Sequence, residues 1–389
     1  MGHKLLVFDT HPVQYRVPIW QQMSVDMPGS VHVVYASDCS VRGRVDKEFG
    51  IAFSWDVPMM AGYEHTVLNC EKGTPLAGWG TLTGEGVREQ IELHKPDAIL
   101  LGGFNYRYDA VVYMNAKRMG IPLWLRCETQ DHCFPRSKAK SIVRSLLYTT
   151  LYKGIDKIFY IGELNKQHYL NHGVPESKLT PARYFTVDRF AELSKEEKSS
   201  LRKTQREKAG IAENAFVIGF SGKLIEKKNP KILYEMQEYL PAELRSRIHL
   251  YFMGSGELEK DLRALTVEAE RKYGSKAFFS GFVNQSQLAG HYLAMDLMVL
   301  PSRKMGETWG LVTNEAMQSG AGVIASDSVG SSADFGNWKQ FRVFKDGDPK
   351  ALADAVVSLA KFERNYDWAL AGLETYSVKQ TSDAFINAF

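Results

Sequence analysis

The chain of 389 residues is longer than one ordinary hydrophobic core, and this length favours two or three domains. Hydrophobic residues make up 44% and charged residues 24%, as in soluble globular proteins, and a net charge of only +3 excludes the global basic field of a nucleic-acid-binding protein. No apolar run approaches the roughly 18 residues that span a bilayer. The opening GHKLLVFD lacks the apolar region and cleavage site of a signal peptide, so we expect a cytoplasmic protein.

The four cysteines all lie in the first half of the chain and form no C-x2-C pair. They are Cys39, Cys70, Cys127 and Cys133. A long chain without a signal sequence is expected to stay reduced, which predicts free thiols and no zinc site.

The first half of the chain alternates apolar strands with helices. Strands are predicted at 4–9, 31–37, 97–103, 122–127 and 157–162, and helices at 15–23, 86–94, 108–117 and 137–153. A longer excursion through FSWDVP, at 53–58, follows the second strand. This alternation predicts parallel β-α units in a doubly wound sheet, and therefore one Rossmann-like domain.

A polar segment at 183–197 predicts a linker, and a second series of elements follows it. Strands are predicted at 215–222, 248–256, 277–282, 297–302, 322–326 and 341–345, and helices at 230–239, 258–272, 285–294 and 308–318. The tail at 367–389 predicts two short helices. Two doubly wound α/β domains, placed at 1–186 and 187–366, predict a cleft between the carboxyl ends of their strands, where open sheets bind ligands.

The stretch at 301–334, PSRKMGETWGLVTNEAMQSGAGVIASDSVGSSAD, has the most informative spacing in the chain. Glu307 precedes a predicted helix that has Thr308 as its N-cap, and Glu315 lies two turns inside that helix. Gly320 and Gly322 are expected to close it. Eight positions along a helix span roughly 12 Å, which is comparable with the length of a sugar diphosphate.

The N–H groups of Gly310, Leu311 and Val312 would form an anion site at the start of this helix. Carboxylates accept hydrogen bonds from hydroxyls at each end, while these amides would hold phosphates between them. The layout suits a nucleotide-sugar. The alternative is that both glutamates are solvated surface residues, as carboxylates on a helix edge usually are.

One stretch of the sequence resembles the E-x7-E signature of retaining glycosyltransferases of family 4. It runs from a predicted strand through Pro-Ser, Glu307, Gly-Leu-Val, Glu315-Ala-Met and Ser-Gly to the strand GVIAS. The resemblance implies the GT-B fold, with two Rossmann-like domains facing a cleft and a C-terminal helix, within 367–389, that crosses back to the first domain. It also implies transfer of a sugar from a nucleoside diphosphate sugar to a hydroxyl acceptor. GT-B enzymes generally need no divalent metal, so no metal or resident cofactor is expected, and the donor is expected to be UDP- or GDP-linked.

The resemblance implies roles for several second-domain residues. SGKLIEKKN, at 221–229, resembles the family pattern G-R-L-x-x-x-K, whose cations contact the donor diphosphate, although Lys223 replaces the arginine and Lys228 is the second cation. Gly254 begins a glycine turn, and Phe282 and Val283 resemble a segment that lines the nucleotide base. Glu307 would bind the transferred sugar and Glu315 the ribose. For each loop, the alternative is an ordinary strand-to-helix turn or a solvated lysine.

The first domain departs from the family pattern. The loop after its first strand is not rich in glycine and has His11, Tyr15 and Arg16, which suggests a loop that recognises the acceptor through its side chains. A hydrogen-bonded structural histidine is the alternative for His11. After PLWLRC, Glu128 and His132 are candidates to touch the transferred sugar, although surface loops are polar in any case.

The helix at 136–153 has five cations, Arg136, Lys138, Lys140, Arg144 and Lys153, and no acid. Its apolar residues are Ile142, Val143, Leu146, Leu147 and Leu151. We expect the apolar face to pack on the core, and contact with an anionic membrane surface is the alternative. In that case the acceptor would be lipid-linked or a growing glycan at the inner membrane. Two further functions stay open: a GT-B nucleotide-sugar epimerase or phosphorylase, and a non-catalytic sugar-binding module.

Overall fold

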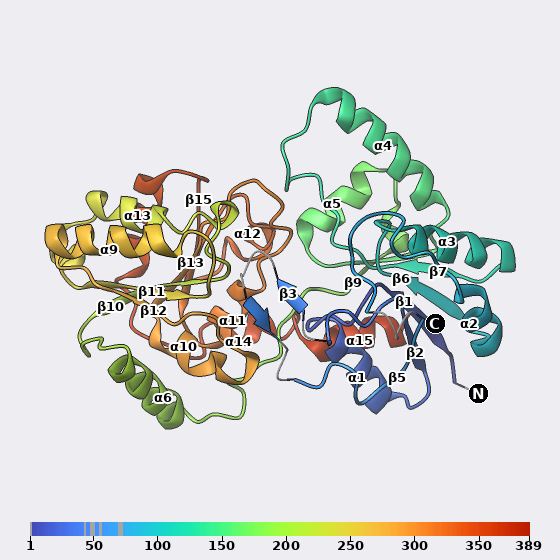
Figure 1. Ribbon diagram of the computed structural model, residues 1–389, viewed down its shortest axis with the longest axis horizontal. Helices are drawn as coiled ribbons and strands as arrows, with labels where there is room; N and C mark the ends of the chain where they lie inside the picture. The colour runs from blue at the N-terminus through green and yellow to red at the C-terminus, as the bar shows by residue number, and fades with distance from the viewer. Residues whose placement is uncertain (1, 43, 47–50, 54–56, 69–72) are drawn as a thin grey trace.

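The structure is a computed structural model that describes residues 2–42, 44–46, 51–53, 57–68 and 73–389. It consists of two α/β domains side by side, each built on a parallel sheet with helices around it (Figure 1). The predicted architecture is confirmed. Residues 54–56 of the predicted excursion, and Cys70, lie outside the described residues. Cys39, Cys127 and Cys133 are free and buried.

The first domain contains a seven-stranded parallel sheet in the order β5-β2-β1-β6-β7-β8-β9. Its strands are β1 (Leu5–Asp9), β2 (Val31–Tyr35), β5 (Glu64–Val67), β6 (Ala98–Leu101), β7 (Leu123–Leu125), β8 (Lys157–Tyr160) and β9 (Leu179–Pro181). Its helices are α1 (Val17–Asp26), α2 (Val87–His94), α3 (Arg107–Met119), α4 (Lys138–Lys153) and α5 (Glu163–Asn171). β3 (Arg44–Asp46) and β4 (Ile51–Phe53) form a separate antiparallel pair. The sequence pattern predicts neither α5 nor β9.

The second domain contains a six-stranded parallel sheet in the order β12-β11-β10-β13-β14-β15. Its strands are β10 (Phe216–Ser221), β11 (Ile248–Met253), β12 (Ala277–Phe279), β13 (Leu297–Leu300), β14 (Gly322–Ser326) and β15 (Phe341–Phe344). Its helices are α6 (Lys195–Lys208), α7 (Ile232–Glu235), α8 (Ala242–Arg245), α9 (Glu259–Tyr273), α10 (Leu288–Ala294), α11 (Val312–Gln318), α12 (Ser332–Phe335) and α13 (Pro349–Leu359). Because α6 begins at Lys195, the end of the predicted linker is helical. The domain boundary predicted at 186 falls between β9 and α6.

The central strands are buried along their whole length because both faces of each sheet are covered. Every residue of β1, β2, β13 and β14 is buried. Nearly continuous apolar strands of this kind are typical of parallel sheets, in which no face is left for polar alternation. The carboxyl ends of β1, β6 and β7 therefore lie along one edge of the first sheet, and those of β10, β11 and β13 lie along one edge of the second.

The chain returns to the first domain at its end. After α14 (Leu370–Leu373), α15 (Val378–Ile386) packs beside α1, and in Figure 1 this red helix lies among the blue elements. The Phe385 ring lies 5.8 Å from Trp20 and 4.4 Å from Phe159, measured between ring centroids. Phe385 is fully buried in the core of the first domain. The predicted crossing of the C-terminal helix is confirmed.

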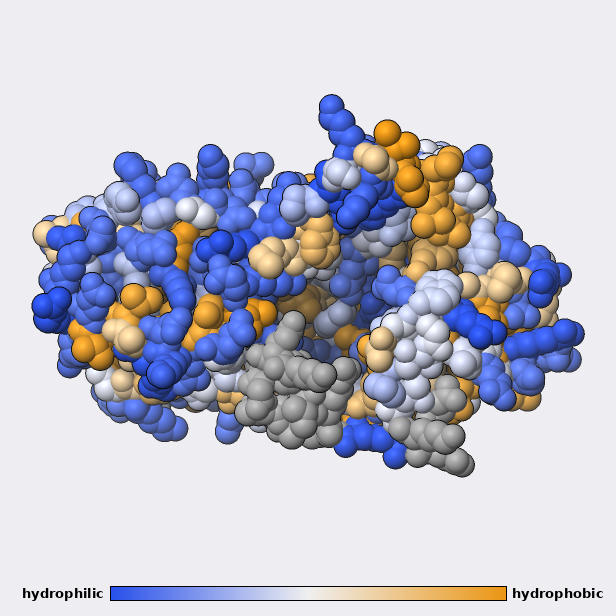
Figure 2. Space-filling model, turned by 45° about the horizontal axis from the view of Figure 1, so that its top comes forward, coloured by the Kyte–Doolittle hydropathy of each residue, from blue (hydrophilic) through white to orange (hydrophobic). Residues whose placement is uncertain are grey.

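The prediction that the apolar face of the basic helix packs on the core is wrong. Ile142, Val143, Leu146 and Leu147 on α4 are between 56% and 70% exposed. The helix projects from the first domain (Figure 1) and touches it mainly through the side that carries Tyr148 and Tyr152. Figure 2 shows hydrophobic atoms over this projecting region, with hydrophilic side chains beside them. In the described part of the chain, no helix is both long and apolar enough to cross a membrane.

Candidate functional site

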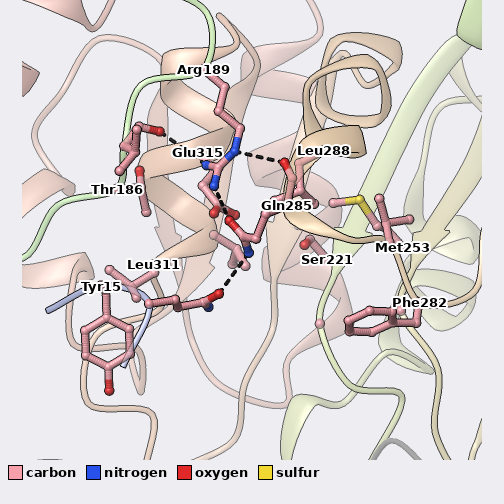
Figure 3. A pocket seen from close by; sticks show the side chains of 16 residues that line it. Tyr15, Thr186, Arg189, Ser221, Met253, Phe282, Gln285, Leu288, Leu311 and Glu315 are labelled. Atoms are coloured by element: carbon pink, nitrogen blue, oxygen red, sulfur yellow. Dashed lines mark hydrogen bonds between the residues drawn. The ribbon is translucent and has the colours of Figure 1, made fainter. Parts of the chain in front are cut away.

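A cavity of about 170 Å³ lies between the two domains (Figure 3). The loop after β1 contributes Gln14 and Tyr15, and the connection between the domains contributes Thr186, Val187 and Arg189. The second domain contributes Ser221, Gly222, Met253, Gly254, Phe282, Val283, Gln285, Leu288, Leu311, Val312 and Glu315. Six of the residues predicted for donor binding, all but Gly310, therefore line one cavity at the carboxyl edge of the second sheet.

Two glycines allow the loops after β10 and β11 to pack backbone against backbone. Gly254 has a φ of +136°, and its N–H donates to the carbonyl of Gly281 at 2.9 Å. A Cβ atom at Gly254 would lie 1.9 Å from the carbonyl oxygen of Gly222. No side chain fits there, so only glycine gives this wall of the cavity its shape.

Glu315 is held in the cavity by a chain of hydroxyl groups. Ser221 Oγ lies 2.9 Å from Tyr292 Oη, and the Tyr292 hydroxyl donates a hydrogen bond to Oε2 of Glu315. Burial raises the pKa of Glu315 above its ordinary value, although the Tyr292 hydrogen bond and the charge of Arg189 oppose the rise. No described residue hydrogen-bonds its Oε1 atom, so this oxygen can accept a hydrogen bond from a ligand hydroxyl.

Arg189 and Gln285 connect the cavity walls. Arg189 Nε donates to the Gln285 carbonyl at 2.9 Å, and its Nη2 atom donates to the Gln285 side chain. Gln285 Nε2 in turn donates to Gln14 Oε1 at 3.0 Å, which bridges the two domains. Figure 3 shows Arg189 and Gln285 next to each other in the cavity, joined by dashed lines. This network fixes the mouth of the cavity through side chains from three separate segments.

Glu307 forms an ion pair with Lys228 beside the interdomain space. The Lys228 ammonium donates to Oε2 of Glu307, and Ser302 Oγ donates to the same oxygen at 3.1 Å. Burial opposes ionisation of Glu307, but the positive charge of Lys228 outweighs it and holds the pKa below its ordinary value. Glu307 and Lys228, which the sequence predicts to contact the sugar and the diphosphate of a donor, therefore contact each other, and neither lines the first cavity. Lys223 lies half-buried in the loop after β10.

A second, charged network occupies the edge of the first sheet. Arg16 donates to Asp9 Oδ1 at 2.7 Å and to Glu128 Oε1 at 3.2 Å. The Tyr15 hydroxyl also donates to Glu128 Oε1, at 3.0 Å. Burial opposes ionisation of Glu128, yet Arg16 and these hydrogen bonds hold its pKa below the ordinary value. Thr308 Oγ1 of the second domain lies 3.4 Å from Glu128 Oε2, so Glu128 faces both domains.

A second cavity of about 380 Å³ opens beside Glu128. It is lined by Arg16, Gly102, Gly103, Phe104, Asn105, Cys127, Glu128, Thr129, Gln130, Cys133, Phe134, Arg136, Arg144, Tyr148 and Thr308. Tyr15 lines the first cavity and hydrogen-bonds Glu128, which lines the second. The two cavities are thus neighbours across the Tyr15–Glu128 contact.

Two candidate histidines lie elsewhere. His132 Nε2 donates to the Asp327 carbonyl at 2.7 Å, so it joins the two domains and lines neither cavity. His11 Nδ1 lies 2.9 Å from the Thr10 hydroxyl, in keeping with a hydrogen-bonded structural histidine. Among the described residues, the nearest approach to a metal-ligand set is Asp131, His168 and His172. In that group both ring nitrogens of His168 already form hydrogen bonds, Nδ1 with Asp131 and Nε2 with the Tyr152 hydroxyl.

The predicted start of the glutamate helix is wrong. α11 begins at Val312, four residues after Thr308, because Gly310 has a φ of +90° and breaks the helix there. Glu315 consequently lies in the first turn of α11 and not two turns inside it. A Cβ atom at Gly310 would lie 2.5 Å from Leu300, so Gly310 serves packing and does not line the cavity. Gly320 ends the helix with a φ of +79°, while Gly322 belongs to β14.

Sequence reasoning missed Tyr292, Arg189 and Gln285. Tyr292 lies in α10 and Gln285 just before it, where the apolar pattern gives no reason to separate them from core residues. Arg189 lies in the segment predicted as a linker. Only one signal pointed to Arg189. It lies in the connection between two domains, and the sequence predicts a ligand-binding cleft between these domains.

Comparison with known proteins bears on the second domain and on the fold. Residues 202–367 match the family model described as Glycosyl transferases group 1. A D-inositol 3-phosphate glycosyltransferase of Catenulispora acidiphila is 34% identical over 131 residues, which cover 32% of this chain and 31% of the relative. The chain thus spans about a third of that relative's length. The matching family model covers the second domain and its sheet.

Solved structures extend the likeness to the whole chain. HepE of Anabaena in complex with UDP superposes with a TM-score of 0.70 at 14% identity, covering 99% of this chain and 98% of that one. HepE with UDP-glucose gives a TM-score of 0.62 at 15% identity, covering 99% and 94%. The protein therefore has the GT-B fold, and its second domain matches the glycosyl transferases group 1 model.

Proposed function

We propose that this protein is a glycosyltransferase that moves a sugar from a nucleoside diphosphate sugar to a hydroxyl acceptor. The observation that carries the proposal is the interdomain cavity, where Glu315, the Gly222–Gly254 loop contact and Phe282 lie together in a GT-B fold. The match of residues 202–367 to a glycosyltransferase family model supports it, as do the UDP and UDP-glucose complexes of the structural neighbour.

In this proposal the donor lies across the first cavity. Phe282 and Val283 contact the base, and the free oxygen of Glu315 accepts a hydrogen bond from the ribose. The N–H groups of Leu311 and Val312 have no backbone acceptor in the described chain and face the diphosphate together with Lys223. Lys228 and Glu307, paired beside the cleft, hold the leaving phosphate and the hydroxyls of the transferred sugar respectively.

We propose retention of configuration by a front-face path without a metal. The bond between the anomeric carbon and the diphosphate oxygen breaks, and its electron pair leaves with the phosphate. The acceptor hydroxyl oxygen forms the new bond to the anomeric carbon, on the face from which the diphosphate leaves. The hydroxyl proton passes to the leaving phosphate oxygen. The chain's contribution is electrostatic and positional, through Lys223 and Lys228 at the developing charge and Glu128 beside the sugar.

The test is whether nucleotide release requires an acceptor. The purified protein is incubated with UDP-glucose and GDP-mannose, with and without a panel of hydroxyl acceptors, and free nucleotide and glycoside products are measured. The proposal predicts acceptor-dependent release of UDP or GDP together with an α-linked product. Release without acceptor, accompanied by an epimerised sugar, would favour the epimerase. Absorbance from a bound pyridoxal group would favour a phosphorylase, and no turnover with intact sugar binding would favour a non-catalytic module.

We also propose that α4 brings the protein to an anionic membrane surface, where a lipid-linked glycan would be the acceptor. The exposed apolar residues Ile142, Val143, Leu146 and Leu147 share this helix with four cations and no acid. Sedimentation with vesicles tests the contact. We expect binding to phosphatidylglycerol vesicles and weak binding to phosphatidylcholine, and loss of binding in a Leu146→Ser/Leu147→Ser variant. Equal binding of both proteins would contradict the contact.

A further inference from the structure

The second cavity holds more positive charge than its carboxylate can balance. Three arginines line it, Arg16, Arg136 and Arg144, against the single carboxylate of Glu128. Arg16 is balanced within its own network, because it contacts both Asp9 and Glu128. The charges of Arg136 and Arg144 therefore need another explanation.

Arg144 is held in place without a strong ion pair. Its guanidinium lies 4.4 Å from the centre of the Tyr148 ring, and Nη2 donates to the Gln130 carbonyl at 3.3 Å. The nearest carboxylate, Asp131, is 3.9 Å away and is itself hydrogen-bonded to His168 at 2.9 Å. The buried Nε atom of Arg144 has no hydrogen-bond partner among the described residues. This is a positioned cation with an unused donor.

Arg136 also lines this cavity. Its Nη1 atom donates to the Asp131 carbonyl at 3.1 Å, and the guanidinium lies 5.5 Å from the centre of the Phe134 ring. Within the described ranges it forms no ion pair with any carboxylate. Arg136 thus lacks a carboxylate partner in the described chain, and Arg144 has only Asp131 at 3.9 Å. A phosphate would supply the charge that both guanidinium groups lack, because the planar fork of arginine matches its oxygens, whereas uncharged sugar hydroxyls would not.

We propose that Arg136 and Arg144 bind a phosphate group on the acceptor. This inference rests on the proposed function, since it takes the second cavity as the acceptor side of the cleft. Glu128, which lines the same cavity, contacts Tyr15 of the first cavity and Thr308, so the acceptor hydroxyl would lie there. The acceptor is then a phosphorylated compound, either a soluble sugar phosphate or the phosphate-bearing head group of a lipid.

Binding measurements on the whole protein separate these sources. Calorimetry is done with glucose 6-phosphate and with glucose, and also with a soluble short-chain phosphatidic acid and the matching phosphatidylcholine, which offer no membrane surface for α4 to bind. Arg136→Gln/Arg144→Gln is the test variant, and Lys153→Gln, at the other end of α4 and away from the cavity, is the control. We expect glucose 6-phosphate or phosphatidic acid to bind the wild type and the control, and the double variant to lose roughly tenfold or more in affinity.

A response to glucose 6-phosphate identifies a soluble acceptor phosphate, and a response to phosphatidic acid alone identifies a lipid. Binding of neither probe, equal binding of glucose, or full binding by the double variant would overturn the inference. Binding of UDP and of GDP, followed by thermal shift on the same proteins, reports separately on the first cavity. The double variant must keep the nucleotide response of the wild type, which shows that the variant is folded. A wild type that binds neither nucleotide would contradict the proposed function and leave the phosphate measurement standing.

Discussion

The two sides of the cleft are built by different means. On the second-domain side, the wall of the first cavity depends on close backbone contact between glycine loops, with Gly254 against Gly222, and on one carboxylate held by Tyr292. On the first-domain side, a network of charged side chains, Asp9, Arg16 and Glu128, lines the edge of the sheet. Backbone contact fixes the shape of the cavity wall, and this shape suits a chemical group that many ligands have in common. Side-chain networks can be exchanged residue by residue, which suits the part of a transferase that differs between acceptors.

The largest expected effect concerns Phe385, through which the C-terminal helix α15 packs into the core of the first domain. Phe385→Ala removes a fully buried ring that packs on Trp20 and Phe159, and such truncations cost about 3–5 kcal/mol. We expect urea unfolding followed by tryptophan fluorescence to show a loss of that size. Lys379→Ala, an exposed change on the same helix, should leave the unfolding curve close to that of the wild type. Equal stability of both variants would show that α15 does not belong to the first-domain core.

The second effect tests the ion pair beside the cleft. Lys228→Ala removes the cation that offsets the charge of Glu307, and we expect turnover to fall by roughly 10² to 10³. Lys231→Ala, whose lysine pairs with the exposed Asp261 at 2.8 Å and not with Glu307, should keep the wild-type rate. Nucleotide release under saturating donor and acceptor measures both. A normally folded Lys228→Ala protein with the wild-type rate would remove this pair from the mechanism.

The third effect sharpens the role of backbone contact on the second-domain side. Gly254→Ala introduces a Cβ atom 1.9 Å from a backbone oxygen, and it does so at a positive φ. Gly274→Ala has a similar backbone penalty at a φ of +72°, but nothing lies within 4 Å of its Cβ. Chemical denaturation should show about 1 kcal/mol of loss for Gly274→Ala and a clearly larger loss for Gly254→Ala. Equal losses would mean that the two loops move apart at no cost.

The smallest effect concerns pH and the first-domain side. Asp109 accepts hydrogen bonds from the N–H groups of Asn105 and Tyr106 beneath the second cavity, and burial raises its pKa to about 7. In the unfolded chain the pKa of this carboxyl group is about 3.9. Its contribution to stability is therefore fully present at low pH and is lost as pH rises through about 7.

Asp109→Asn cannot ionise, so its melting temperature should fall less than that of the wild type between pH 4 and 8. Asp97→Asn, an exposed change, should follow the wild type. Parallel curves for all three proteins would show that Asp109 is ionised throughout this range.

Sequence patterns anticipated the second-domain side of the cleft better than the first. Six predicted donor residues line one cavity because glycines, strand ends and the spacing around Glu315 leave a local signature in the chain. The start of α11 was misplaced, since the positive φ at Gly310 depends on packing against Leu300. The partners of Glu128 and Arg189 could not be predicted, because each network joins residues that are far apart in sequence. The exposure of Ile142 and Leu146 was also missed, because periodicity predicts an apolar face but does not show what covers it.

The most direct measurement is a thermal-shift panel of UDP, GDP, TDP and ADP with their common sugars, on the wild type and on Glu315→Gln, with and without EDTA. The account predicts that one nucleotide stabilises the wild type, by about 2.7 kcal/mol at a hundredfold excess over its dissociation constant. The shift should be independent of EDTA and weaker in Glu315→Gln. No stabilisation of the wild type by any nucleotide, or an equal shift in Glu315→Gln, would contradict the assignment of the interdomain cavity as the donor site.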